Sequence, residues 1–139
     1  MQVIVDSNRV FSALLSKGKV FEVFILNKSL KKIDFISPEL LFNEIGRNLG
    51  DIVNRSKLSS KELSIVFNLI KEQVEPIPFE DFNNLADEAE KISPHEKDAK
   101  YFALALFMNC GIWSNEKAFR DQTKVKIFSD DELLKFLLS

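Results

Sequence analysis

At 139 residues the chain has the length of one compact domain, and we expect a single domain over residues 1–139. Its formal net charge of −2 excludes a protein that coats nucleic acid through overall positive charge, so RNA binding would need a local basic patch or metal ions. A single cysteine excludes an internal disulfide, and the longest apolar run, Tyr101–Met108, is too short to span a bilayer. We therefore expect a cytoplasmic protein without a membrane partner.

The first half of the chain begins with an apolar, β-branched run at Gln2–Val5, which predicts a buried strand followed by a helix start at Asp6 and Ser7. Proline suits the first turn of a helix, so Ser37–Pro38 predicts a helix N-terminus. In chain order we predict a strand at Gln2–Val5, helices over Val10–Leu15 and Val20–Asn27, a strand at Ile33–Ile36, and a helix from Ser37–Pro38 to Leu49.

The second half contains two capping boxes, Ser59 with Glu62 and Ser129 with Glu132, and each predicts a helix start. The predicted elements are a helix to about Lys71, a short strand at Val74–Ile77, helices over Asn84–Ile92 and Asp98–Met108, strands at Gly111–Trp113 and Val125–Phe128, and a helix over Asp130–Leu138. Strands that alternate with helices predict an α/β fold with a parallel sheet covered on both faces. Ligands bind such sheets at the carboxyl ends of the strands.

Asp6 directly follows the first predicted strand, which would deliver its carboxylate to the carboxyl edge of the sheet. By itself Asp6 is better explained as a helix N-cap, because aspartate is among the residues preferred there. Asn8 adds a second oxygen ligand two residues later.

Glu44 lies three residues after Leu41 and four after Leu40, so it falls on the apolar stripe of its predicted helix. A charge in that position costs free energy unless it is paired or bound to a metal ion. Alternatively, Glu44 stands at the edge of the stripe and reaches water. The helix alone does not separate these alternatives.

Asp98 opens the most apolar predicted helix, and Glu116 follows the predicted strand that ends at Trp113. Each has a simple explanation as a first-turn acid that is stabilised by the helix dipole. The joint pattern is stronger, because acids follow strand ends or open buried helices at four places. Oxygen ligands suit Mg²⁺ or Mn²⁺, and such ions support phosphodiester hydrolysis.

Other candidates are weaker. His95 is predicted to be solvated, and Cys110 to belong to the core rather than to act as a nucleophile. Basic residues gather near two of the acids and could hold a phosphate backbone, although a solvated face is the default explanation. They are Lys97, Lys100, Lys117, Arg120, Lys124 and Lys126.

Four segments in this order resemble the motifs of PIN-domain nucleases, in particular the VapC-like toxin ribonucleases. They are Val3-Ile4-Val5-Asp6-Ser7-Asn8 with Phe11-Ser12-Ala13-Leu14, Ser37-Pro38-Glu39-Leu40-Leu41 leading to Glu44, Glu96-Lys97-Asp98-Ala99 with Leu104-Ala105, and Ile112-Trp113-Ser114-Asn115-Glu116-Lys117. No single motif is specific, but the ordered set is, and it extends from about residue 2 to residue 134.

The resemblance implies a Rossmann-like, three-layer α/β/α fold and an Mg²⁺- or Mn²⁺-dependent endoribonuclease that acts on single-stranded RNA. Such proteins are often the toxin of a toxin–antitoxin pair, with an antitoxin partner, and often homodimers. It implies that four acids are catalytic metal ligands and that four neighbours support them. The acids are Asp6, Glu44, Asp98 and Glu116, and the supporting residues are Ser7, Asn8, Ser114 and Asn115.

One position departs from the family pattern, because Glu116 stands where the family normally has aspartate. Glutamate keeps the charge but adds one methylene group, so it would reach a metal ion through a water molecule or weaken the site. Glu96 also replaces an aspartate that is common two residues before the third acid. The alternative function is therefore a PIN-like module that binds RNA or a partner protein with little catalysis.

Overall fold

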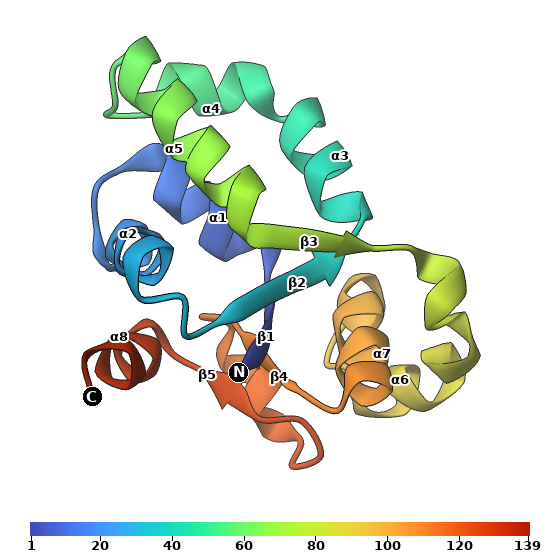
Figure 1. The fold of residues 1–139 in the computed structure, drawn as a ribbon. Helices are drawn as coiled ribbons and strands as arrows, with labels where there is room; N and C mark the ends of the chain where they lie inside the picture. Colours follow the sequence, from blue (N-terminus) through green and yellow to red (C-terminus); the bar gives the residue numbers. More distant parts are fainter.

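The computed structural model describes all residues 1–139 and contains a five-stranded, wholly parallel sheet of order β3-β2-β1-β4-β5 (Figure 1). The strands are β1 (Gln2–Val5), β2 (Asp34–Pro38), β3 (Val74–Ile77), β4 (Gly111–Trp113) and β5 (Ile127–Phe128). The helices are α1 (Ser7–Leu15), α2 (Lys19–Leu30), α3 (Leu40–Arg47), α4 (Leu49–Arg55), α5 (Ser60–Gln73), α6 (Ala86–Ile92), α7 (Ala99–Met108) and α8 (Asp130–Leu138). The predicted α/β fold with a central parallel sheet is confirmed.

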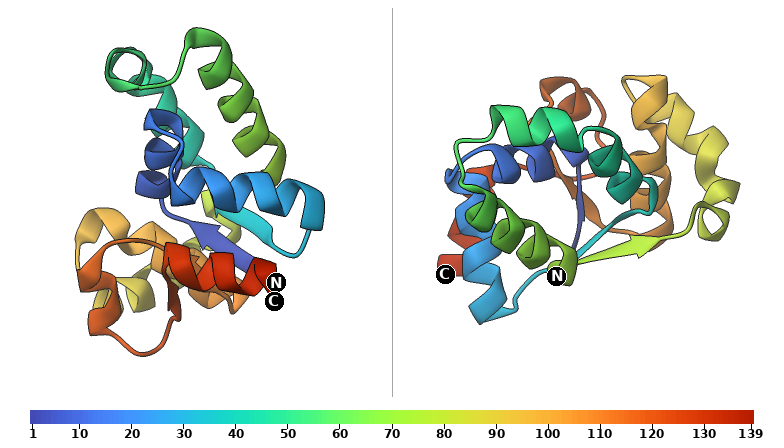
Figure 2. Two further views of the ribbon diagram at one scale, coloured as in Figure 1. Left: turned by 90° about the vertical axis from the view of Figure 1, so that its left-hand side faces the viewer. Right: turned by 90° about the horizontal axis from the view of Figure 1, so that it is seen from above.

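The sheet separates two apolar cores, because successive strand side chains point to opposite faces. Val3 and Val5 join the core under α1, α2, α5 and α8, whereas Ile4 joins the core under α6 and α7. Figure 2 shows these two helical layers on either side of the strands. In the larger core Phe24, Phe35 and Trp113 form a cluster with ring centroids 5.2 to 5.5 Å apart.

The central strand β1 pairs with β2 on one side and with β4 on the other. The chain leaves β1 toward β2 and β3, and only later returns to add β4 and β5 on the opposite side. This reversal makes the carboxyl end of β1 a topological switch point, the usual place for a ligand site in an open parallel sheet.

The predicted helix start at Ser37–Pro38 is wrong, since both residues belong to β2 and pair with Pro76 and Ile77 of β3. The pairing of β2 with β1 ends at Ile36, so Pro38 lies beyond it and its missing N–H leaves no gap in that ladder. Helix α3 therefore begins only at Leu40.

The single helix predicted to run to Leu49 is also wrong, because α3 and α4 are separated at Asn48. The backbone of Asn48 leaves the helical region (φ −106°, ψ 10°), and its side-chain amide donates to the Glu44 carbonyl oxygen at 2.8 Å. Asparagine favours such breaks because its side chain competes for backbone partners. The break leaves Leu49 half exposed instead of buried.

The remaining differences are small. The last strand covers only Ile127–Phe128, and α6 and α7 begin one or two residues later than predicted because short 3-10 turns precede them. Both predicted capping boxes are present at the starts of α5 and α8. No helix combines the length and the apolar character that a bilayer crossing requires.

Gly111 at the start of β4 has no room for a side chain. A Cβ atom there would lie 2.5 Å from the Phe128 ring and 2.8 Å from the Lys126 carbonyl oxygen, and the second contact is with backbone. We expect Gly111→Ala to destabilise the fold by about 1–3 kcal/mol in urea unfolding, the usual cost of overpacking. The control is Gly50→Ala in α4, where nothing lies within 4 Å and alanine should add about 0.5–1 kcal/mol. Equal effects of the two substitutions would contradict the packing described for β4.

Candidate functional site

Three of the four sequence-predicted acids line one cavity at the carboxyl edge of the sheet. Asp6 reaches it from the end of β1, Glu44 from α3, and Asp98 from the residue before α7. The cavity has a volume of about 370 Å³, and basic side chains line it as well, namely Arg47, Lys97 and Lys100. The site thus combines carboxylates with cations from three different elements.

Asp6 is nearly buried, and each of its carboxylate oxygens accepts one hydrogen bond. Its Oδ1 accepts a hydrogen bond from the Asn8 backbone N–H at 3.4 Å, as a helix N-cap does. Its Oδ2 accepts one from the Ser114 hydroxyl at 2.8 Å. Burial raises the pKa of Asp6, the negative charge of Asp98 raises it further, and the two hydrogen bonds act in the opposite direction. The carboxylate therefore lies in the cavity without a cation in contact with it.

Glu44 is paired with Lys100, whose Nζ lies 2.5 Å from Glu44 Oε1. Both side chains are about one-fifth exposed, at 22% for Glu44 and 21% for Lys100, so this ion pair is shielded from bulk water. The lysine explains how a charge is tolerated beside Leu41 and Ile45, the buried residues of α3, whereas Leu40 of the predicted stripe is exposed. Sequence analysis placed Lys100 among basic residues near the acids but gave no signal for this partner, which lies 56 residues away.

Asp98 has no side-chain capping bond at the start of α7, and it is only partly buried. Burial is the main reason that its pKa is raised, and the charge of Glu116 raises it further, while Lys97 and His95 lower it. Glu116 does not line the cavity, but its charge acts on Asp98 and its backbone N–H donates to the Ser114 hydroxyl oxygen at 3.1 Å. Ser114 therefore connects Asp6 to the segment that bears Glu116.

The other predicted supporting residues differ in their positions. Ser7 is buried and its backbone N–H donates to the Tyr101 hydroxyl at 3.3 Å. Asn8 lines the cavity, whereas Asn115 is exposed and outside it. Burial raises the pKa of Cys110 to about 11, so the thiol is neutral near pH 7 and is not an activated nucleophile.

The oxygen ligands of this cavity suit a hard divalent cation. Asp6, Glu44 and Asp98 supply carboxylates only, the type of ligand preferred by Mg²⁺ and Mn²⁺. As arranged, no three acidic, histidine or cysteine side chains are close enough together to hold one ion, and Glu44 is held by Lys100. The residues fit a divalent cation in type, provided that Glu44 exchanges its lysine or binds through water.

A buried ionic cluster beside the cavity escaped sequence analysis. Arg9 of α1 donates through Nη1 to both carboxylate oxygens of Asp130, at 3.0 and 3.1 Å, and Trp113 Nε1 donates to the same carboxylate at 2.8 Å. Arg9 is only 8% exposed and its Nε has no partner. The cluster joins α1 and α8 to the end of β4, which maintains the frame in which Asp6 and Ser114 meet.

Comparison with known proteins agrees with this architecture. A family model described as the PIN domain matches residues 4–129. Among solved structures, the crystal structure of VapBC2 from Rickettsia felis, bound to a DNA fragment from its promoter, contains a chain with the same fold. The TM-score is 0.64 at 14% sequence identity, and the alignment covers 93% of this chain and 98% of that one. No curated protein sequence matches significantly.

The raised pKa values of Asp6 and Asp98 predict how stability depends on pH without metal ions. A carboxyl group with a raised pKa binds protons more tightly in the folded state than in the unfolded state. Its contribution to stability is therefore fully present below its unfolded pKa and is lost as pH rises through its folded pKa. In EDTA, urea unfolding should show Asp98→Asn to be more stable than wild type at pH 7.5. The variant should also gain less stability than wild type when the pH is lowered to 5.

Asp98→Asn keeps the shape of the side chain, so a loss of stability at pH 7.5 would mean that the Asp98 charge stabilises the start of α7. In that case the raised pKa attributed to the burial of Asp98 and to the charge of Glu116 would be incorrect.

Proposed function

The chain belongs to the PIN-domain family, and on this basis we propose that it is an Mg²⁺- or Mn²⁺-dependent endoribonuclease that hydrolyses phosphodiester bonds in single-stranded RNA. The observation that best supports the proposal is the meeting of Asp6, Glu44 and Asp98 in one cavity at the carboxyl edge of the sheet. These acids come from three separate segments of the chain, and core packing gives no reason for them to line the same cavity.

In this proposal Asp6, Glu44 and Asp98 would hold the cation, and Glu116 would assist from outside the cavity. When bound, the ion polarises the scissile phosphate and provides a nucleophilic water at neutral pH. Ser114 orients Asp6 through the 2.8 Å hydrogen bond to Oδ2, and the Asn8 backbone N–H restrains Oδ1. Such outer partners fix the direction of a ligand oxygen before the ion arrives.

A local basic rim allows an acidic protein to approach RNA. Arg47, Lys97 and Lys100 line the same cavity as the acids, although the chain has a net charge of −2. Phosphate contacts from such side chains position a strand and supply affinity that does not depend on sequence. Arg120 and Lys126 are less available, because both pair with Glu132.

We further propose that the protein is the toxin of a toxin–antitoxin pair, with an antitoxin partner and a homodimeric state. The fold shared with a chain of VapBC2 supports this assignment. The alternative, a PIN-like module that binds RNA or a protein with little catalysis, is favoured by the Glu44–Lys100 ion pair, which occupies one proposed ligand.

RNA cleavage tests the proposed activity. Wild-type protein should cut a labelled single-stranded RNA with Mn²⁺ or Mg²⁺ and not in EDTA. Loss of an outer partner of a metal ligand already costs roughly 10- to 100-fold, so Asp6→Asn and Asp98→Asn should each lower the rate by more than about 100-fold. The matched control is Asp34→Asn, an exposed carboxylate at the amino end of β2, which should leave the rate unchanged. RNA that is bound by wild type but never cut would favour the binding module.

Lys100 should compete with the cation for Glu44. Lys100→Met removes the partner but keeps much of the apolar stem, so Mn²⁺ should bind about fivefold more tightly in isothermal titration calorimetry. Lys97→Met is the matched control, because Lys97 lines the same cavity but is exposed and has no ion pair. Both substitutions remove one positive charge from the cavity. If they increase the Mn²⁺ affinity equally, the effect comes from the net charge of the cavity, and Lys100 does not block Glu44.

A further inference from the structure

A second cavity adjoins the acids, between α1 and α4. It has a volume of about 390 Å³, within the range of ligand pockets of roughly 300–1,000 Å³. Asn8, Phe11 and Asn48 line both this cavity and the acidic one, so the two adjoin. A ligand that passes over these three side chains would occupy both cavities.

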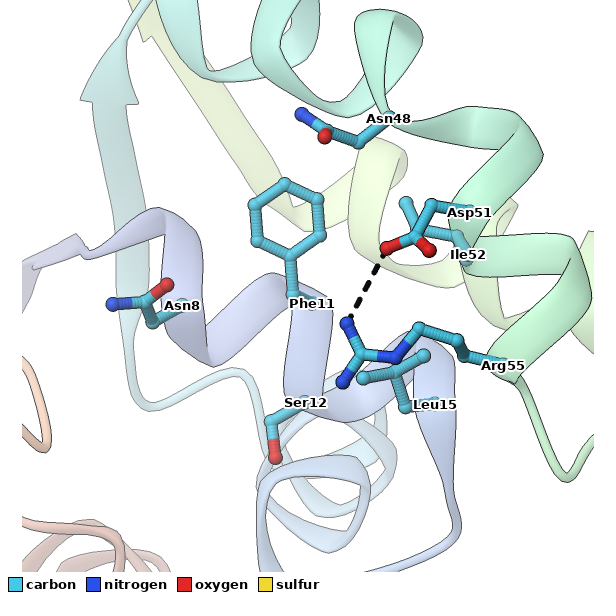
Figure 3. A pocket seen from close by; sticks show the side chains of 8 residues that line it. All are labelled: Asn8, Phe11, Ser12, Leu15, Asn48, Asp51, Ile52 and Arg55. Atoms are coloured by element: carbon cyan, nitrogen blue, oxygen red, sulfur yellow. Dashed lines mark hydrogen bonds and ion pairs between the residues drawn. The ribbon is translucent and has the colours of Figure 1, made fainter.

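The wall of this second cavity contains an aromatic ring flanked by amides. Figure 3 shows the ring of Phe11 rising from α1, with the amide of Asn48 above it and that of Asn8 to its lower left. Phe11 packs partly against the larger core, which restrains the ring, and it is not fully buried. Restrained aromatic faces of this kind stack with unpaired bases in proteins that bind single-stranded nucleic acid.

The polar groups of the cavity have hydrogen-bonding capacity to spare. The side chain of Asn8 makes no hydrogen bond within the protein, and Asn48 uses only its Nδ2, as a donor to the Glu44 carbonyl oxygen. Two carbonyl oxygens and one amide nitrogen thus remain free beside the ring. Amide side chains can donate to and accept from the edge of a base.

The charges of the cavity point to a neutral ligand. Its one cation, Arg55, is paired with Asp51 at 3.3 Å, as the dashed line in Figure 3 marks. A phosphate would have to compete with Asp51 for Arg55 and would be repelled by the Asp51 carboxylate. A neutral heterocycle would leave this ion pair intact. The free cations Lys97 and Arg47 lie instead in the acidic cavity, where a phosphate would be held.

We propose that this cavity is a nucleobase subsite, which holds an unstacked base next to the scissile phosphate, with Phe11 as the stacking surface and Asn8 and Asn48 on the base edge. The inference rests on the proposed ribonuclease function and extends it. The substrate would be RNA in which a base can unstack from its neighbours, so base-paired RNA would not be bound at this subsite.

Fluorescence anisotropy tests the subsite in the Asp98→Asn background, which removes cleavage. The probes are a labelled eight-nucleotide single-stranded RNA and the same RNA with abasic sugars throughout. Phe11→Leu should weaken binding of the normal RNA on the order of tenfold, the expected loss of one stacked base, and leave the abasic RNA unchanged. Phe11→Trp should restore the affinity. The matched control is Phe107→Leu, an exposed phenylalanine of α7 outside both cavities, which should change neither.

Two failures are distinguishable. If wild type cuts the RNA but Phe11→Leu and Phe107→Leu bind both probes equally well, the subsite is wrong and the nuclease stands. If wild type neither binds nor cuts RNA with either metal ion, the proposed function is wrong and the subsite is overturned with it. A thermal melt of each variant verifies that it is folded before binding is compared.

Discussion

The hydrogen bonds between β1 and β4 are the constraint on which the candidate site depends. They continue past the last paired residues, because the Asp6 backbone N–H donates to the Trp113 carbonyl oxygen at 3.1 Å. This contact places Ser114 opposite Asp6, so that its hydroxyl reaches Oδ2. A slip of one residue would point Ser114 to the other face of the sheet and remove the partner of a buried carboxylate. The register of two short strands thus decides the geometry of Asp6.

Of the charged side chains near the end of β1, some are paired with an opposite charge and Asp6 is not. Arg9 is neutralised by Asp130, and Glu44 by Lys100, but Asp6 has only a hydroxyl and a backbone N–H as partners. A more stable protein would replace such a carboxylate or give it a cation. Its presence therefore carries a cost in stability, which is common where function and stability compete. The Arg9 guanidinium donates to Asp130 rather than to Asp6, although its positive charge lowers the pKa of Asp6.

Local signals in the sequence predicted much of this structure, and contacts between distant residues account for what it missed. The apolar run before Asp6 and the capping boxes at Ser59 and Ser129 are local signals. They predicted where β1 ends and where α5 and α8 begin. Pro38 was misplaced because only the pairing with β3 shows that it can remain in a strand. The Glu44–Lys100 and Arg9–Asp130 pairs join residues 56 and 121 positions apart, which no periodicity in the chain indicates.

The break at Asn48 lies where the two cavities meet. Because the Asn48 amide donates to the Glu44 carbonyl oxygen, the residue that ends α3 is tied to the turn that carries a proposed metal ligand. The same break directs α4 across α1, so that Asp51 and Arg55 face Phe11 in the second cavity (Figure 3). Asn48 thus belongs to both cavities, because its side chain lines each of them and its amide closes the turn of α3 that carries Glu44. The Lys100 partner of Glu44 comes from α7, and Asp6 from the end of β1, so the acids are held by elements that meet only in the folded chain.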